Sequence, residues 1–197
     1  MSRLNHRQEG FTISEMVVVV SLLAIVAVLF ANFFSDNYKS YIELQQNTVR
    51  VNALSSASQR IARVLRGLTT ITTAESTNIT GYAYFTPRDS TLSRVRYFFD
   101  GSDNTVKVGV IPATGTAPNY TYNTASERIT TIAENIDGNV DIFTYLDISG
   151  QVGVYSADTY KDIKGIGLHL KGAAVAGYSS PFEIKTSISL RNRKTNL

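Results

Sequence analysis

An apolar run near the amino end is the feature that most constrains the fold of this chain. From Met16 to Phe34 the only polar residues are Ser21 and Asn32. A helix needs about 20 apolar residues to cross a bilayer, whereas a cleaved secretory signal has an apolar region of about 7–15 residues followed by a small-residue cleavage site. No Ala-x-Ala site follows here, because the run ends in FANFFSDNYKSY. The run therefore predicts a transmembrane helix.

Charged residues in front of the run add two expectations. Arg3 and Arg7 precede it, so the positive-inside rule predicts a cytoplasmic amino end and an exported remainder. Glu15 directly precedes the first residue of the run. An acid at the bilayer centre costs roughly 2.5–3.5 kcal/mol, and less near the interface. Glu15 therefore either marks the membrane boundary, with the span starting at Met16, or has a partner that offsets its charge.

The segment around Glu15 resembles the class III signal of type IV prepilins and type II secretion pseudopilins. In EGFTISEMVVVVSLLAIVAVL, Gly10 ends a short basic leader, Phe11 supplies the aromatic residue after it, and Glu15 is the glutamate fifth after the cut. The resemblance implies that prepilin peptidase cuts after Gly10 and N-methylates Phe11. It also implies a leader at residues 1–10 and a transmembrane helix at residues 11–34 that stays on the mature protein.

Processing of this kind gives the Glu15 carboxylate a physical role. Cleavage would create an α-amino group on Phe11, with a reference pKa of about 8, at a helix amino terminus, where the macrodipole disfavours positive charge. Glu15 lies four residues on, on the same helix face. Its carboxylate can neutralise that amine in its own chain or in a neighbouring chain, and losing one partner of such a pair in low dielectric is costly. We therefore hypothesise that Glu15 sets the register when a subunit joins a filament.

Residues 35–69 are predicted to continue the helix as an amphipathic segment. The segment has no proline, and its first glycine is Gly67. Apolar residues recur at three- and four-residue steps, namely Leu54, Ala57 (or Ser58), Ile61, Leu65 and Leu68. The pattern predicts a helix from about Thr12 to Leu68 that ends around 65–69. Arg60, Arg63 and Arg66 form either its solvated side or a nucleic-acid-binding face.

Residues 70–197 are predicted to form a β-rich domain. Residues 94–111 resemble a hairpin with Asp-Gly and Asp-Asn turn residues. Residues 140–155 resemble another, turning near Asp147–Gly150. Residues 110–127 are rich in Thr, Ala, Asn and Pro and are expected to be exposed loops.

The last part of the chain shows the clearest alternation of apolar and polar residues. In DIKGIGLHLKG, Ile166, Leu168 and Leu170 share one face, and PFEIKTSISLRNRK alternates in the same way. The two segments are expected to pair across a loop at 171–181. The predicted fold class is therefore α+β, with the long amino-terminal helix packed on one antiparallel sheet, which is the pilin fold that the resemblance implies.

A closer resemblance points to the J-type minor pseudopilins and related minor pilins. It rests on RYFFDGSDNTVKV, ITTIAENIDGNVDIFTYLD and the ending TSISLRNRK. Many major pilins also carry a proline near the middle of the long helix, and this chain has none before Pro87. The resemblance implies a minor subunit of the initiating or tip complex. Its partners would be prepilin peptidase, other major and minor pilins or pseudopilins, an inner-membrane assembly platform and the lipid bilayer.

No catalytic motif accompanies these features. The chain has no cysteine, which excludes disulfides, thiolate metal sites and a cysteine nucleophile. It also has no P-loop, no His-Glu-x-x-His and no Gly-x-Ser-x-Gly. We expect no enzymatic activity, cofactor or metal. His6 would leave with the leader, and His169 lies on a predicted strand, where a solvated or structural role is expected and not a catalytic one.

Two further groups of polar residues have a functional and a plain interpretation. Residues Asp100–Asn104 offer oxygen ligands for calcium, but they lack the spacing of an EF-hand, so a hairpin turn is favoured. The basic residues near the carboxyl end, Arg191, Arg193 and Lys194, form either a DNA contact or a solvated tail. The net charge of +3 is too small to require an anionic partner.

Three functional hypotheses remain from the sequence. The first is a minor pilin or pseudopilin, anchored in the cytoplasmic membrane and then assembled into a cell-surface or periplasmic filament. The second is a competence-type minor pilin that binds DNA. The third is a plain single-pass anchored domain, which predicts an uncleaved leader and no effect of Glu15 on assembly.

Overall fold

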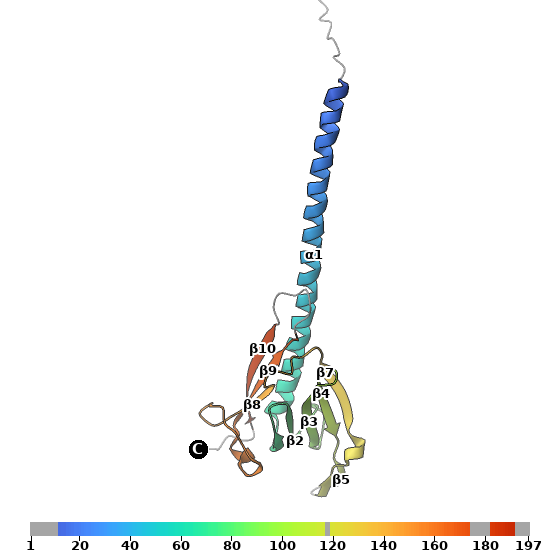
Figure 1. Cartoon of the computed structure of the whole chain (residues 1–197). Coiled ribbons are helices and arrows are strands. Elements are labelled where there is room, and N and C mark those ends of the chain that lie inside the picture. Colours follow the sequence, from blue (N-terminus) through green and yellow to red (C-terminus); the bar gives the residue numbers. More distant parts are fainter. Residues whose placement is uncertain (1–11, 117–118, 174–181, 192–197) are drawn as a thin grey trace, which may run out of the picture. The chain divides into compact units, whose positions relative to one another are not determined.

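The computed structural model describes residues 12–116, 119–173 and 182–191. The chain divides into two compact units, residues 1–48 and 49–197. Helix α1 (Ile13–Arg66) begins in the first unit and ends in the second (Figure 1). The predicted helix from about Thr12 to Leu68 is confirmed at both ends. No proline interrupts it, and β-branched residues in its first half do not prevent it because a long apolar helix satisfies its own backbone hydrogen bonds.

The end of α1 differs from a glycine cap. The amide of Gly67 donates to the carbonyl of Val64 at 3.0 Å, and the amide of Leu68 donates to that of Leu65 at 3.1 Å. These i→i−3 bonds tighten the last turn and satisfy carbonyls that the α-helix leaves free. Gly67 is not among the glycines with positive φ, so the helix ends without a left-handed residue.

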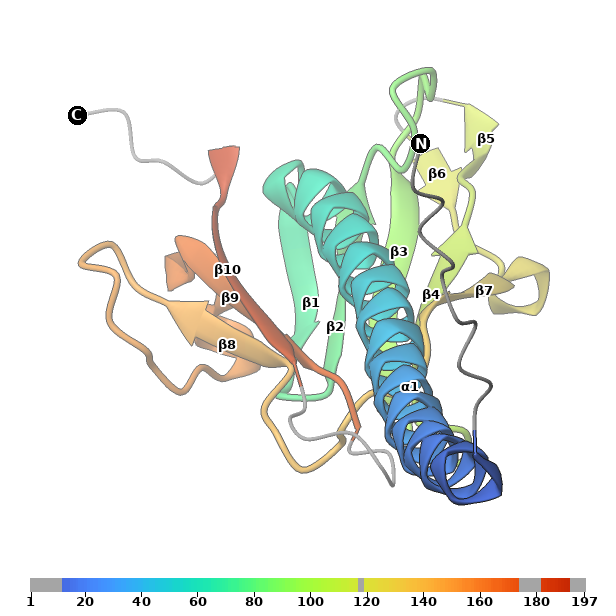
Figure 2. The same cartoon turned by 90° about the horizontal axis from the view of Figure 1, so that it is seen from above.

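The second unit contains two main antiparallel sheets (Figure 2). The five-stranded sheet has the order β1-β2-β3-β4-β7, with β1 (Thr70–Ala74), β2 (Asn78–Ala83), β3 (Ser93–Asp100), β4 (Thr105–Ile111) and β7 (Arg128–Ala133). The three-stranded sheet has the order β10-β9-β8, with β8 (Phe143–Leu146), β9 (Gly165–Lys171) and β10 (Glu183–Ser189). The described residues also form two short 3₁₀ helices, η1 (Thr124–Ser126) and η2 (Ala157–Asp162).

A single apolar cluster joins the carboxyl part of α1 to both sheets. The predicted helix stripe is confirmed, since all of its members are buried: Leu54, Ala57, Ser58, Ile61, Leu65 and Leu68. From the sheets, the cluster takes the alternate residues that face the helix, including Val95, Tyr97, Ile166 and Leu168. This burial, at about 25 cal/mol per Å² of apolar surface, holds the end of the helix against the β-rich domain.

Two predicted strand pairs are confirmed. Strands β3 and β4 form a hairpin in which Arg94 pairs with Ile111 and Asp100 pairs with Thr105. Asn104 has a φ of 54° in its turn, a conformation that Asn tolerates better than most residues. Strands β9 and β10 pair from Lys171–Glu183 to Gly165–Ser189, as the alternating pattern predicted.

Three predictions about the β-rich domain were wrong in part. The predicted antiparallel β-structure is confirmed, but the described strands form two main sheets and a two-stranded ribbon where a single sheet was expected from the sequence. Residues 140–155 do not form a hairpin of two strands: after β8 and its turn, only Val152 returns, in an isolated bridge to Leu146. The returning arm contains glycine at 153, which weakens a strand, and β8 takes β9 as its partner instead.

Most described residues of the threonine-rich segment at 110–127 are exposed or half-exposed, apart from the buried Ile111, but the segment is not only loop. It contains strands β5 (Thr114–Thr116) and β6 (Asn119–Thr121), which pair with each other. The hydroxyl groups of Thr114 and Thr121 lie 2.9 Å apart across this ribbon, and such cross-strand Thr pairs stabilise a ladder. The bounds of β1, β2 and β7 were also missed, because these strands are short and their apolar and polar residues do not alternate strongly.

Candidate functional site

The first turn of α1 is built around Thr12 and Glu15. The backbone amide of Thr12 donates to Oε2 of Glu15 at 2.9 Å, and the Thr12 hydroxyl donates to the same oxygen at 3.0 Å. In return, the backbone amide of Glu15 donates to Oγ1 of Thr12 at 3.3 Å. The carbonyl of Thr12 accepts the first helical bond, from Met16, at 3.1 Å. This reciprocal arrangement is a capping box, in which two amides left free by the helix find acceptors.

The capping box gives Glu15 a partner that sequence reasoning missed. Both side-chain hydrogen bonds of the carboxylate use Oε2, so Oε1 lies outside them. The spacing Thr-x-x-Glu in TISE is the known signature of such a cap and would have predicted it. Gly10 and Phe11, the predicted cleavage and methylation residues, lie outside the described residues.

The apolar segment of α1 that follows is exposed to solvent in the described part of the chain. Apolar side chains from Ile13 to Phe34 are exposed, Ile13 to 86% and Leu29 to 63%. A continuous apolar surface of this size requires lipid or other protein around it. Helix α1 is long and apolar enough to cross a membrane by length and composition. An acidic cap followed at once by an uncovered apolar helix is thus the arrangement at this end of the described structure.

Comparison with known families identifies this arrangement. Residues 5–31 match the family model described as the prokaryotic N-terminal methylation motif. The chain carries an N-terminal methylation motif. This class III signal is consistent with type IV pilins and pseudopilins, and it confirms the resemblance at that level. A search of the curated proteins found no match to the chain.

The methylation motif accounts for the main features of the first unit. It indicates processing by prepilin peptidase and assembly with other pilins, and with the apolar helix it indicates a membrane-anchored single-pass protein. It points to a structural subunit and not to an enzyme. The α+β architecture, a long apolar helix followed by antiparallel β-structure, is pilin-like. The motif ends at residue 31, so the J-type resemblance, which rests on later segments, stays a prediction.

Lys107 of β4 contacts the carboxylates that were considered from the sequence as calcium ligands at Asp100–Asn104. Nζ of Lys107 lies 2.7 Å from Oδ2 of Asp100 and 2.8 Å from Oδ2 of Asp103. Asp100 also accepts from the amide and hydroxyl of Ser102. The hydrogen bond from Lys107 is the largest cause that lowers the pKa of each carboxyl. Within the described ranges, no group of three or more His, Asp or Glu side chains is arranged to hold a metal.

His169 lies on β9 and forms a surface pair with β10. Its Nε2 is 2.9 Å from Oε2 of Glu183, and Nζ of Lys185 is 3.1 Å from the other carboxylate oxygen. The hydrogen bond from His169 is the largest cause that lowers the pKa of Glu183. The contact joins neighbouring strands on the face away from the helix, since the alternate residues Ile166 and Leu168 are buried.

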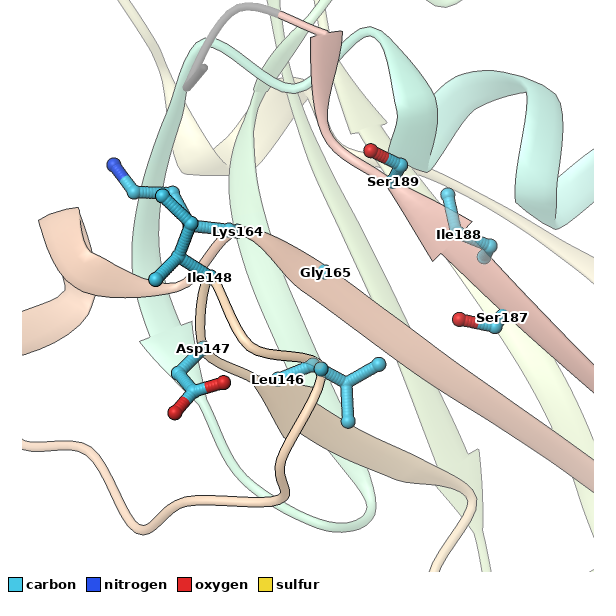
Figure 3. A pocket seen from close by; sticks show the side chains of 9 residues that line it. Leu146, Asp147, Ile148, Lys164, Gly165, Ser187, Ile188 and Ser189 are labelled. Atoms are coloured by element: carbon cyan, nitrogen blue, oxygen red, sulfur yellow. The ribbon is translucent and has the colours of Figure 1, made fainter. Parts of the chain in front are cut away.

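A hollow of about 370 Å³ lies over Gly165, at one end of the three-stranded sheet (Figure 3). Leu146 and Asp147 stand on one side of it, and Ser187 to Ser189 of β10 stand on the other. Asp147 is engaged by the amides of its own turn, at 149 and 151. Among the described contacts, no hydrogen bond joins Asp147 or Lys164 to either serine of the lining, so no nucleophile-and-base pair is assembled here.

Proposed function

We propose that this protein is a minor pilin or pseudopilin, a structural subunit of a type IV pilus or type II secretion-like filament. It is cut after Gly10, methylated on Phe11 and held by the transmembrane part of α1 with its amino end in the cytoplasm and its β-rich domain outside. The observation that carries the proposal is the methylation motif at residues 5–31. The exposed apolar surface of α1 supports it, because that surface suits first a bilayer and then neighbouring helices.

Glu15 has two successive tasks in this proposal. In the isolated chain its Oε2 caps α1 through Thr12. After cleavage, the remaining oxygen can accept a hydrogen bond from the ammonium of Phe11 or of an adjacent subunit, a charge-assisted contact that strengthens in low dielectric. A subunit placed one turn out of register would leave both charges unpaired in the membrane, which is costly. Glu15 thereby selects the position at which the subunit is added.

A role in the initiating or tip complex is supported by two sequence features. No proline precedes Pro87, unlike in many major pilins, and the β-rich domain resembles that of J-type minor subunits. Partners would then be other minor subunits and the inner-membrane assembly platform. A DNA-binding competence pilin is the second candidate, since Arg60, Arg63 and Arg66 are all exposed on α1.

Intact-mass spectrometry of the protein from the membrane of its own host tests the proposal. The expected mass lacks residues 1–10 and carries one additional methyl group. An unprocessed chain in cells with active prepilin peptidase would contradict the filament role and leave a plain anchored domain. DNA affinity is measured separately as a function of salt concentration. The competence candidate requires an affinity that depends steeply on salt. It also requires that this affinity falls when the basic residues near the carboxyl end are neutralised, namely Arg191, Arg193 and Lys194.

A further inference from the structure

Two arginines of β3 lie on the face of the five-stranded sheet that points away from α1, and they differ in their hydrogen-bond partners. On β3, Val95 and Tyr97 are buried toward the helix, at 2% and 1% exposure. Arg94 and Arg96 alternate with them and therefore lie on the opposite face. Both are only half-exposed, so neighbouring residues on that face partly enclose them.

Arg96 forms a bidentate ion pair with Glu127 of the same chain. Its Nε lies 3.1 Å from Oε1 of Glu127, and its Nη2 lies 3.0 Å from Oε2. The guanidinium also lies 4.2 Å from the centre of the Phe98 ring. Gly109 of β4 is the cross-strand neighbour of Arg96 on β3. It leaves space for this contact, because a Cβ at Gly109 would collide with the Glu127 carboxylate. The bidentate fork is the strongest geometry between these two groups.

Arg94 lies two residues before Arg96 on the same face of β3 and has no comparable partner among the described residues. It lines a hollow of about 280 Å³ together with Arg96, Ile111, Thr124 and Glu127. Among the described residues, no hydrogen bond or ion pair engages its guanidinium. Ile111, its cross-strand neighbour, is 2% exposed but lies outside the main apolar cluster, so it forms an apolar floor on this outer side.

We propose that this hollow binds the carboxylate of an Asp or Glu side chain presented by another protein. The planar guanidinium of Arg94 matches a carboxylate bidentately, the Thr124 hydroxyl offers a second donor, and Ile111 takes the methylene groups of the incoming side chain. The chain already contains a contact of the same kind, between Arg96 and Glu127, which are 31 residues apart in the sequence. The inference is independent of the filament proposal.

Charge decides between an acidic protein side chain and a nucleic acid. Among the described residues that line the hollow, Arg94 is the one cation without an ion-pair partner, and Glu127 adds a carboxylate. Asp100 and Asp103 lie farther along the same hairpin. Lys107 balances part of the Asp100 and Asp103 charge, and Arg96 balances Glu127. Little positive charge beyond Arg94 is therefore left to neutralise a phosphate chain, which brings one charge per residue. A single carboxylate with an apolar stem fits both the charge and the floor.

The test uses the full chain in detergent micelles with ¹⁵N-labelled arginine, and it follows the side-chain Nε signals by nuclear magnetic resonance. The probes are two five-residue peptides that are identical except for a central glutamate or glutamine, and a twelve-nucleotide single strand of DNA. We expect a saturable shift of the Arg94 signal with the glutamate peptide and binding at least about tenfold weaker with the glutamine peptide. Equal responses to both peptides, or no response to the glutamate peptide, would overturn the proposal.

Variants separate this site from general positive charge. Arg94→Gln is expected to abolish glutamate-peptide binding, whereas Arg128→Gln, at an exposed arginine on β7 of the same sheet, is expected to retain it. Glu127→Gln removes the neighbouring carboxylate and releases Arg96 from its ion pair, so it is expected to tighten glutamate-peptide binding several-fold. Arg94→Lys keeps the fold and the positive charge but loses the planar guanidinium that binds a carboxylate through two hydrogen bonds, so it is expected to weaken binding. Equal losses in Arg94→Gln and Arg128→Gln, or DNA binding that depends on Arg94 and exceeds peptide binding, would contradict an acidic protein partner.

Discussion

The hydroxyl groups of Ser58 on α1 and Thr186 on β10 lie 3.0 Å apart. Ser58 is 3% exposed, so this is a polar contact inside an otherwise apolar interface between the helix and the three-stranded sheet. Each hydroxyl supplies what the other needs, which removes the cost of burying either alone. The pair fixes the position of α1 along β10, because a hydrogen bond requires a specific geometry and apolar contacts tolerate small shifts between the two elements.

Removing one member of this pair is expected to cost more than removing both. Ser58→Ala leaves the Thr186 hydroxyl without its partner and is expected to lower the free energy of unfolding by about 1 kcal/mol or more. Ser58→Ala combined with Thr186→Val is expected to recover most of that loss. Denaturant unfolding of the full chain in micelles measures both. Ser56→Ala, at an exposed helix position, is the control, and additive losses in the double variant would show that the hydroxyl groups do not interact.

Gly109→Ala is expected to be the more damaging of two matched glycine substitutions. A methyl group at Gly109 would meet the carboxylate of Glu127 and would displace it from Arg96, at a cost of about 1–3 kcal/mol. Gly101→Ala is the control, since its nearest neighbour would be Phe99 at 3.7 Å, an ordinary contact. Thermal unfolding compares the two. A harmless Gly109→Ala would show that Glu127 can shift without loss of stability.

The Lys107 cluster is expected to stabilise the fold only over a limited pH range. Hydrogen bonds from Lys107 lower the pKa of Asp100 and Asp103, so their contribution is complete above the unfolded value of about 3.9 and disappears as the pH falls through the folded values. The pKa of Lys107 is raised by the same bonds, so its contribution is complete below about 10.4 and is lost at higher pH. Lys107→Met is therefore expected to lower the Tm at pH 7.

The size of that Tm difference against pH is the measurement. It is expected to shrink as the pH falls below about 4 and through the lowered pKa values of Asp100 and Asp103, because protonation removes the ion pairs with Lys107. Lys161→Met, at an exposed lysine of η2, is expected to change the Tm little at any pH. A Lys107→Met difference that stays constant down to the lowest pH would assign the effect to lost packing of the lysine stem.

Glu15→Gln separates the capping role of Glu15 from its charge. An amide oxygen can still accept from Thr12, so the helix is expected to begin at the same residue and the leader is expected to be cleaved. The negative charge is lost, and under the proposed function incorporation into filaments is expected to fall by tenfold or more, about 1.4 kcal/mol. Sheared-filament yield and membrane-extracted protein are measured in the same cells.

Two further variants complete this comparison. Thr12→Ala removes the cap hydroxyl and is expected to destabilise the helix start by about 1 kcal/mol while leaving incorporation largely intact. Glu43→Gln makes the same charge change at an exposed position of α1 and is expected to be neutral. Normal assembly of Glu15→Gln would confine Glu15 to helix capping.

Local sequence rules determined the elements with strong signals. The helix was predictable because no proline interrupts residues 13–66 and because its apolar stripe keeps a helical period. The β3–β4 hairpin and the β9–β10 pair were predictable from turn residues and strict alternation. The methylation motif was visible for the same reason, since its three marker residues stand at fixed spacing in one continuous segment.

Tertiary structure decided what depends on residues far apart in the chain. No local sequence pattern predicts that β8 pairs with β9 and not with the segment that follows its own turn. Likewise, none predicts that Glu127 forms an ion pair with Arg96 over the backbone of Gly109. Those choices follow from competition among alternative partners for burial and hydrogen bonds, which is settled only when the whole core forms. The sequence by itself thus determined the apolar anchor and its methylation motif, and the packed β-rich domain decided which arginine of β3 pairs with Glu127.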